Sequence, residues 1–196
     1  MMKNSISDCS ESKNKNTKLE SVYQKATLSG GCFWCTEAIF QQLKGVVQVE
    51  SGYSGGKIEN PTYRKVISGT TAHSEVVEIK YDKFQISYRD LIKIHLTTHN
   101  PTTLKKRRAT DQFSPYRSIV FYRSEAEKEV AIEVIREVQD FFDKKIVTEV
   151  KEFQIFYKAS LYHQNYYETK PNSLYCQTII DPKLEKFKRL YKEKMK

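Results

Sequence analysis

Runs of apolar residues divide the chain into alternating strands and helices. Short apolar runs predict strands over 23–28, 46–53, 76–81, 117–122 and 146–153. In the run 46–53, apolar and polar residues alternate. Apolar residues at helical spacing predict helices over 36–43, from Ser87 to before Asn100-Pro101, from Ser124 to Val138, and from Pro182 onward. The order of elements predicts an α+β fold in which helices pack a mixed or antiparallel sheet. Its core is expected to be a ferredoxin-like α/β sandwich with long irregular loops.

Three stretches between these elements carry no regular period. They span residues 52–71, 101–115 and 156–178, and loops of that length in a compact domain are usually functional. Residues 1–20 are rich in Lys, Asn and Ser, so we interpret them as a disordered tail and 21–196 as a single catalytic domain. This tail has no apolar segment typical of a secretory signal, so we expect a cytoplasmic protein.

Charge and composition exclude some functions. The 196 residues carry a formal net charge of +9, but no run approaches the roughly 20 apolar residues of a membrane span. Much of the basic excess lies in 105–108 and 183–196, where no aromatic stacking platform accompanies it. We therefore expect a solvated basic face, and we expect neither nucleic acid nor a membrane as a partner.

The most informative motif is a cysteine that follows two glycines at the predicted start of a helix. Gly30 and Gly31 deliver Cys32, where the unpaired N–H groups and the helix dipole favour a thiolate. Cys35 follows one turn later, within disulfide reach, so the two cysteines could form a general thiol–disulfide redox centre. The alternative is that Cys32 is a buried structural cysteine of the core, as most free cysteines are. The four His are scattered and give no ligand spacing for zinc, so we expect no metal. Cys9 has no assigned role.

A carboxylic acid and several phenols are the next candidates. Glu75 stands at the edge of a predicted strand, and in an aromatic pocket it would have a raised pKa and hold a proton at neutral pH. Tyr63 lies in the first irregular stretch, Asp111 and Tyr116 lie in or directly after the second, and the third is crowded with tyrosines. The three loops could therefore line one pocket.

These residues resemble a known family. Gly31-Cys32-Phe33-Trp34 followed by Glu37 is similar to the signature of the peptide methionine sulfoxide reductase A family. Further blocks of the family follow in order: 52–56, 60–63, 69–75, Asp111 with 116–118, 162–166, and Tyr175-Cys176. The resemblance extends from about Tyr23 to Cys176. It implies that methionine S-sulfoxide in proteins is reduced to methionine, and it leaves open whether the free amino acid is accepted.

The resemblance also implies residue roles. Cys32 attacks the sulfoxide sulfur, while Phe33 and Trp34 hold the methyl group of the substrate. A proton reaches the sulfoxide oxygen from Glu75, which the hydroxyls of Tyr63 and Tyr116 assist, with Asp111 as a supporting residue. This agrees with the chemistry, because the oxygen leaves poorly until it is protonated.

Cys32 would then carry a sulfenic acid, which a second thiol converts to a disulfide. Cys176 matches the resolving position of the family, whereas Cys35 is nearer and lies on the same predicted helix. The sequence slightly favours Cys176 and leaves Cys35 open. An external dithiol, thioredoxin, would reduce the disulfide, so no bound cofactor is expected, and we expect a monomer.

The chain departs from the family in two places. Lys105–Thr110 replaces a run that usually contains glycine, which puts the role of Asp111 in doubt, and Asn100 replaces a common Asp. Two other functions compete with the reductase. A general thiol–disulfide oxidoreductase would use Cys32 and Cys35, and a nucleic-acid-binding module would use the basic charge alone.

Overall fold

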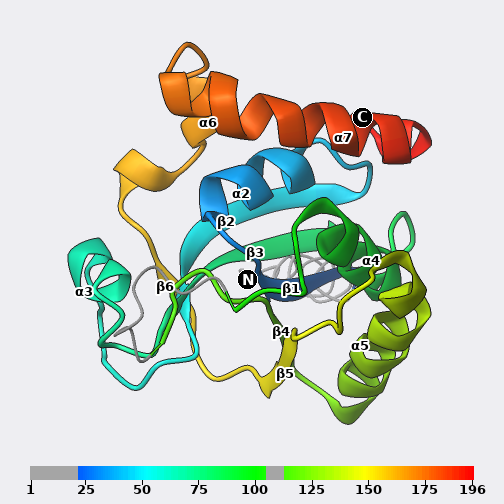
Figure 1. Cartoon of the computed structure of the whole chain (residues 1–196), viewed down its shortest axis with the longest axis horizontal. Helices are drawn as coiled ribbons and strands as arrows, with labels where there is room; N and C mark the ends of the chain where they lie inside the picture. Colours follow the sequence, from blue (N-terminus) through cyan, green and yellow to red (C-terminus); the bar gives the residue numbers. More distant parts are fainter. Residues whose placement is uncertain (1–21, 105–112) are drawn as a thin grey trace, which may run out of the picture.

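A six-stranded sheet forms the centre of the molecule in the computed structural model, which describes residues 22–104 and 113–196 (Figure 1). The strands are β1 (Tyr23–Ser29), β2 (Val46–Ser54), β3 (Ser74–Asp82), β4 (Ile119–Tyr122), β5 (Glu149–Glu152) and β6 (Tyr157–Lys158). They are ordered β5-β4-β1-β3-β2-β6, and every neighbouring pair is antiparallel except β4 and β5.

The first four strands confirm the predicted fold class. With α2 (Phe33–Gln41) and α4 (Tyr88–Thr98) they run β-α-β-β-α-β, and their order in the sheet is β4-β1-β3-β2. This is the split arrangement of a ferredoxin-like sandwich, in which β3 lies between β1 and β2. The helix α5 (Glu125–Val138) then crosses from β4 to the parallel β5, which is the connection that a parallel pair requires.

Two serines begin the helices that the sequence placed there. Ser87 and Asp90 cap α4 reciprocally, each side chain accepting from the backbone N–H of the other. Ser124 accepts from the N–H of Glu127 at the start of α5, but the Glu127 carboxylate accepts from Arg123 N instead of Ser124 N. The second capping box is therefore only half formed, although the predicted helix is present.

The alternation of side chains along β3 positions the site. Glu75 shares one face of β3 with Val77, Ile79 and Tyr81, and these three apolar residues are fully buried in the main core under the helices. The opposite face carries Val76, which joins a smaller core with residues of β4. Because α2 packs on β2 and β3, the carboxyl of Glu75 comes to lie under the first turn of α2.

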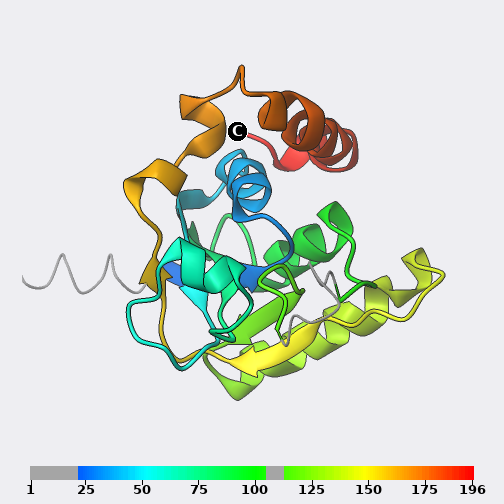
Figure 2. The same ribbon diagram turned by 60° about the vertical axis from the view of Figure 1, so that its left-hand side comes forward.

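A C-terminal layer covers α2 on the side away from the sheet. In both views α7 (Asp181–Tyr191) lies over α2, and the segment that leads to it wraps around the edge of the sheet (Figures 1 and 2). This segment contains short helical elements: η2 (Leu161–His163), α6 (Tyr166–Thr169) and the π-helix η3 (Cys176–Ile180). The stretch expected to be irregular over 156–178 is therefore largely folded.

The first stretch without a predicted period, residues 52–71, also contains regular structure. Residues 52–71 include the end of β2 and the short helix α3 (Tyr63–Ile67), which Thr62 caps. Of the remaining sequence predictions, the tail over 1–20 with Cys9, the basic run 105–108 and Asp111 fall outside the described residues. Among the residues that are described, no helix is both long and apolar enough to cross a bilayer.

Candidate active site

Cys32 occupies the N-terminal cap of α2, as the glycine pair predicts. Its backbone is extended (φ −68°, ψ 127°), and the first N–H groups of the helix follow directly. Gly31 takes a left-handed conformation with φ 90°, which favours glycine, and its N–H donates to Tyr116 O at 3.1 Å. The cysteine is half-buried, so its sulfur lies at the junction between core and surface.

Glu75 is held against the first residue of the same helix. Its Oε2 accepts the N–H of Phe33 at 3.0 Å, which places the carboxyl one residue from Cys32. The side chain is 1% exposed, and burial raises its pKa to about 8, partly opposed by the Phe33 N–H. Glu75 is therefore protonated at neutral pH and can donate that proton beside the cysteine.

Cys32 and Cys35 behave as one coupled dithiol. The Cys32 thiol donates a hydrogen bond that lowers the pKa of Cys35 to about 6, and the same bond raises the pKa of Cys32 well above its usual value. Tyr175 donates towards both sulfurs, and Lys183 from α7 also lowers the pKa of Cys35. The first negative charge of the pair thus lies on Cys35, whereas the helix dipole alone favoured Cys32.

This placement has a chemical consequence. The pKa of Cys35 is lowered and that of Cys32 is raised, so a thiolate on Cys35 can accept the proton of Cys32. A cysteine with such a base one helical turn away can form its thiolate as it attacks.

Aromatic rings surround the dithiol. Phe33 is 1% exposed and forms the floor, with its ring centroid 6.0 Å from Tyr53 and 5.3 Å from His163. Trp34 is half-buried, and Tyr166 stacks on it at 3.6 Å with nearly parallel planes. The apolar wall that the sequence predicted is present, but Trp34, and not Phe33, reaches the rim.

The loops bring two of the three predicted supporting residues close to this cup. Tyr63 begins α3, and its ring lies 4.5 Å from that of His163. The backbone next to Tyr116 runs along the start of β3, where Pro115 O accepts from Glu75 N at 2.8 Å. Asp111 lies outside the described residues. Within the described ranges, no group of three or more His, Cys, Asp or Glu is placed to hold a metal ion.

A sequence profile described as peptide methionine sulfoxide reductase matches residues 24–195. The chain belongs to this family. The enzyme MsrA of Saccharolobus solfataricus is 47% identical over 171 residues, which cover 87% of this chain and 96% of that protein. MsrA of Deinococcus radiodurans is 41% identical over 188 residues, which cover 95% of this chain and 91% of that protein.

Solved structures of the family share the fold. Reduced Mxr1 from Saccharomyces cerevisiae superposes with a TM-score of 0.72 at 29% identity, covering 80% of this chain and 90% of that one. Methionine sulfoxide reductase A of Corynebacterium diphtheriae gives a TM-score of 0.67 at 27% identity, and the match covers 78% of this chain and 77% of that one. The chain is thus an oxidoreductase of the methionine sulfoxide reductase A type, as its motifs predicted.

The two candidate resolving cysteines of this reductase have different surroundings. Cys35 lies one helical turn after Cys32, and the neighbouring Cys32 thiol lowers its pKa. Cys176 begins η3 and is fully buried in the main core. Cys35 thus lies on the same helix as Cys32, one turn further along, whereas Cys176 lies on a separate element.

Some residues of the site were missed by sequence reasoning. Glu37 is buried under the 161–168 segment and accepts from Tyr166 N at 3.3 Å, and burial raises its pKa to about 7. Its place in the signature, one turn beyond Trp34, could have suggested a structural role. Tyr175 belongs to the tyrosine-rich stretch that the sequence placed at the pocket, whereas Lys183 gave no such signal, because its effect on the pKa of Cys35 depends on how the C-terminal layer folds back over α2.

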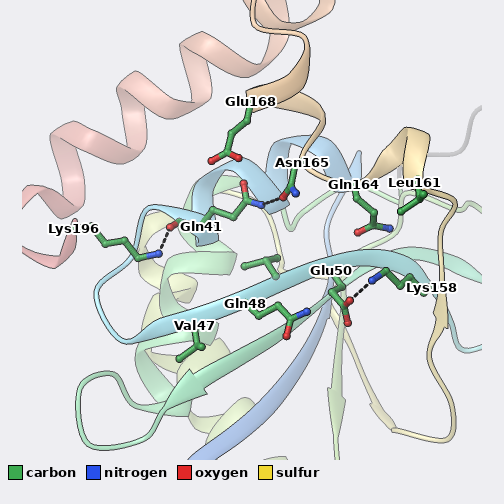
Figure 3. Close-up of a pocket in the computed structure, with 11 residues that line it drawn as sticks. Gln41, Val47, Gln48, Glu50, Lys158, Leu161, Gln164, Asn165, Glu168 and Lys196 are labelled. Atoms are coloured by element: carbon green, nitrogen blue, oxygen red, sulfur yellow. Dashed lines mark hydrogen bonds and ion pairs between the residues drawn. The ribbon is translucent and has the colours of Figure 1, made fainter.

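A separate groove of about 400 Å³ lies between β2, the end of α2 and the 161–168 segment (Figure 3). Its walls are bound together by polar contacts, including Gln41 Nε2 to Asn165 Oδ1 at 2.6 Å and an ion pair between Lys158 and Glu50. Neither the dithiol nor Glu75 lines it, so it is distinct from the reductase site.

Proposed function

We propose that the chain reduces protein-bound methionine S-sulfoxide, and also the free amino acid, through a sulfenic acid on Cys32. The observation that carries the proposal is the protonated Glu75, hydrogen-bonded at the helix start beside a coupled dithiol. A simple dithiol exchange centre has no use for a neutral carboxylic acid, whereas sulfoxide reduction needs one to protonate the oxygen. We assign the S epimer from the resemblance to the methionine sulfoxide reductase A family alone, since each sulfoxide epimer is reduced by its own type of enzyme.

The first step transfers one oxygen atom. Cys32 attacks the sulfoxide sulfur while its proton passes to the Cys35 thiolate, and Glu75 donates its proton to the sulfoxide oxygen. The S–S bond formed by the attack and the S–O bond of the substrate then break as a new S–O bond forms on Cys32, so methionine leaves and Cys32 becomes a sulfenic acid. Trp34 and the rings around it hold the methyl group in an apolar place, and we assign assisting roles to the hydroxyls of Tyr63 and Tyr116.

The second step closes a disulfide. We propose Cys35 as the thiol that attacks the Cys32 sulfenic acid, because it already lies against that sulfur; Cys176 then acts as a later relay. An external dithiol of the thioredoxin class reduces the product by exchange. A yeast protein of the same fold, Mxr1, has been solved in complex with Trx2. Cytoplasmic location and the monomeric state stay predictions.

Three cysteine variants test this order. Without reductant, the Cys32→Ser variant should release no methionine from a peptide carrying the S-sulfoxide, whereas wild type should release at least one equivalent per chain. Cys35→Ser should still release one equivalent and then stop with sulfenic acid on Cys32. Cys176→Ser is the matched control and should form the Cys32–Cys35 disulfide normally. Methionine release by Cys32→Ser would refute the assignment.

A general thiol–disulfide oxidoreductase is the second candidate, favoured by the low pKa of Cys35. Reduction of insulin disulfides, without any release of methionine from sulfoxide peptides, would establish this function instead. The reductase predicts the opposite pair of results.

A further inference from the structure

A short turn before β4, residues 114–117, joins the two halves of the active site. Pro115 O accepts the N–H of Glu75 at 2.8 Å. The next carbonyl along the turn, Tyr116 O, accepts at 3.1 Å the N–H of Gly31, which directly precedes the nucleophilic cysteine. Neighbouring carbonyl groups of one turn therefore hold the backbone of the acid and the backbone of the cysteine. The conformation of this turn sets how the two groups lie relative to each other.

The last residue of the turn, Arg117, holds it closed. Arg117 is 7% exposed, and its Nη1 donates to Ser114 O at 2.9 Å, three residues earlier in the chain. Within the turn, Ser114 Oγ accepts the N–H of Tyr116 at 3.2 Å. Arg117 O accepts the hydroxyl of Ser29 at 2.7 Å, at the end of β1 that leads to the glycine pair. One buried residue thus fixes both ends of the turn.

The same guanidinium group also reaches the segment that leads to the acid. Arg117 Nη2 donates to Ala72 O at 2.7 Å. Ala72 has φ 59°, a left-handed conformation that is uncommon for residues other than glycine and that persists only where its surroundings hold it. The contact with Arg117 therefore fixes the direction of the chain three residues before Glu75.

An ion pair completes the contacts of this guanidinium group. Arg117 Nε lies 3.0 Å from Oε1 of Glu149 in β5, whose side chain is partly exposed. The three nitrogen atoms therefore bind three separate segments of the chain, through Ser114 O, Ala72 O and Glu149. A planar group with donors in fixed directions can join three such acceptors, whereas the single ammonium group of a lysine cannot.

We propose that Arg117 is a positioning residue for the first step, which aligns Glu75 with Cys32 through the backbone of the 114–117 turn. The inference rests on the function proposed above and deepens it, because it gives oxygen transfer a residue that acts through the backbone alone. Arg117 neither gives nor takes a proton in the step. Its loss therefore costs what misalignment costs, and a displacement of about 1 Å can slow a reaction about 10²-fold.

The experiment measures single-turnover release of methionine from the S-sulfoxide peptide in three variants. Arg117→Lys keeps the charge beside Glu149 but reaches only one of the two carbonyls, so it should be about tenfold slower than wild type. Arg117→Met loses both contacts and should be about 10²-fold slower. In both, the peptide concentration that gives half the maximal rate should change less than about threefold, because the aromatic cup is intact. Glu149→Gln keeps an acceptor for Nε and should follow wild type.

Arg123→Met is the matched control for the loss of an arginine that joins several segments. Arg123 also binds a carboxylate and a backbone carbonyl, through Glu78 at 3.0 Å and Lys25 O at 3.1 Å. Lys25 lies near the start of β1, whereas Cys32 follows the end of that strand. The control should therefore lower the midpoint of urea unfolding and leave the rate of methionine release unchanged.

A double-mutant cycle separates positioning from a general loss of structure. The Glu75→Gln background lacks the acid that Arg117 aligns, so adding Arg117→Lys there should slow methionine release less than about threefold. The full tenfold loss in that background would overturn the inference. So would a wild-type rate in Arg117→Met, or a Glu149→Gln variant as slow as Arg117→Lys. Failure of the proposed function is visible separately, because wild type would then release no methionine at all.

Discussion

The Glu75→Gln variant removes the proton that the site holds while it keeps the hydrogen bond that positions the side chain. Glu75 Oε2 accepts the Phe33 N–H at 3.0 Å, and a glutamine carbonyl can accept the same bond. With a pKa of about 8 the wild-type acid is roughly nine-tenths protonated at pH 7 and about one-tenth at pH 9. The amide holds no transferable proton at any of these pH values.

The expected loss is that of a general acid, about 10²- to 10⁴-fold in the rate of methionine release. In wild type this rate should rise as the dithiol ionises with a pKa of about 6 and fall as Glu75 ionises with a pKa of about 8. The variant should keep the first limb and lose the second. The assay is single-turnover release of methionine from the S-sulfoxide peptide between pH 5 and pH 10.

The Glu75→Gln variant should lose activity but gain stability at high pH. The folded-state pKa of Glu75 is raised from 4.5, so its favourable contribution is complete below that pH and is lost as the pH rises through about 8. Above pH 8 the variant should therefore unfold with a free energy larger than that of wild type, by roughly 3–5 kcal/mol at most. Glu50→Gln, in the separate groove, is the control. An unchanged rate in Glu75→Gln would refute the role of this acid.

Three further changes test the surroundings of the site. Burial raises the pKa of Glu37 to about 7, so the stability of wild type should fall as the pH rises through 7. The Glu37→Gln variant should flatten that part of a plot of Tm against pH. An equally steep plot for the variant would contradict the burial argument. Phe33→Ala should lose about 3–5 kcal/mol in urea unfolding, because it empties a fully buried position, and a loss below about 1 kcal/mol would argue against its place in the core. Gly31→Ala should cost about 1–2 kcal/mol through its positive φ, and an unchanged midpoint of unfolding would be inconsistent with that conformation.

The sequence predicted the elements whose signals are local. The alternation over 46–53, the apolar runs of the other strands and the caps at Ser87 and Ser124 correspond to β2, the rest of the sheet and the helices α4 and α5. The glycine pair before Cys32 identified the start of α2 for the same reason, since a turn and a helix cap are read over a few residues.

The parts that were missed depend on contacts between distant segments. The chain over 156–178 carries few apolar repeats, and its short helices are held by packing of Tyr166 on Trp34 and by the buried Glu37. The lowering of the Cys35 pKa by Lys183 likewise requires α7 to lie over α2. Propensity and spacing carry no information on such pairings, so the resolving partner of Cys32 could not be chosen from the sequence.

The central claim is that Cys32 takes the sulfoxide oxygen and that Cys35 waits beside it to resolve the product. The most direct measurement is mass spectrometry of the Cys35→Ser variant after one turnover with the S-sulfoxide peptide and a sulfenic-acid trap such as dimedone. The account predicts one equivalent of methionine per chain and the trap attached to Cys32. A trap on Cys176, or methionine formed with no adduct on Cys32, would contradict it.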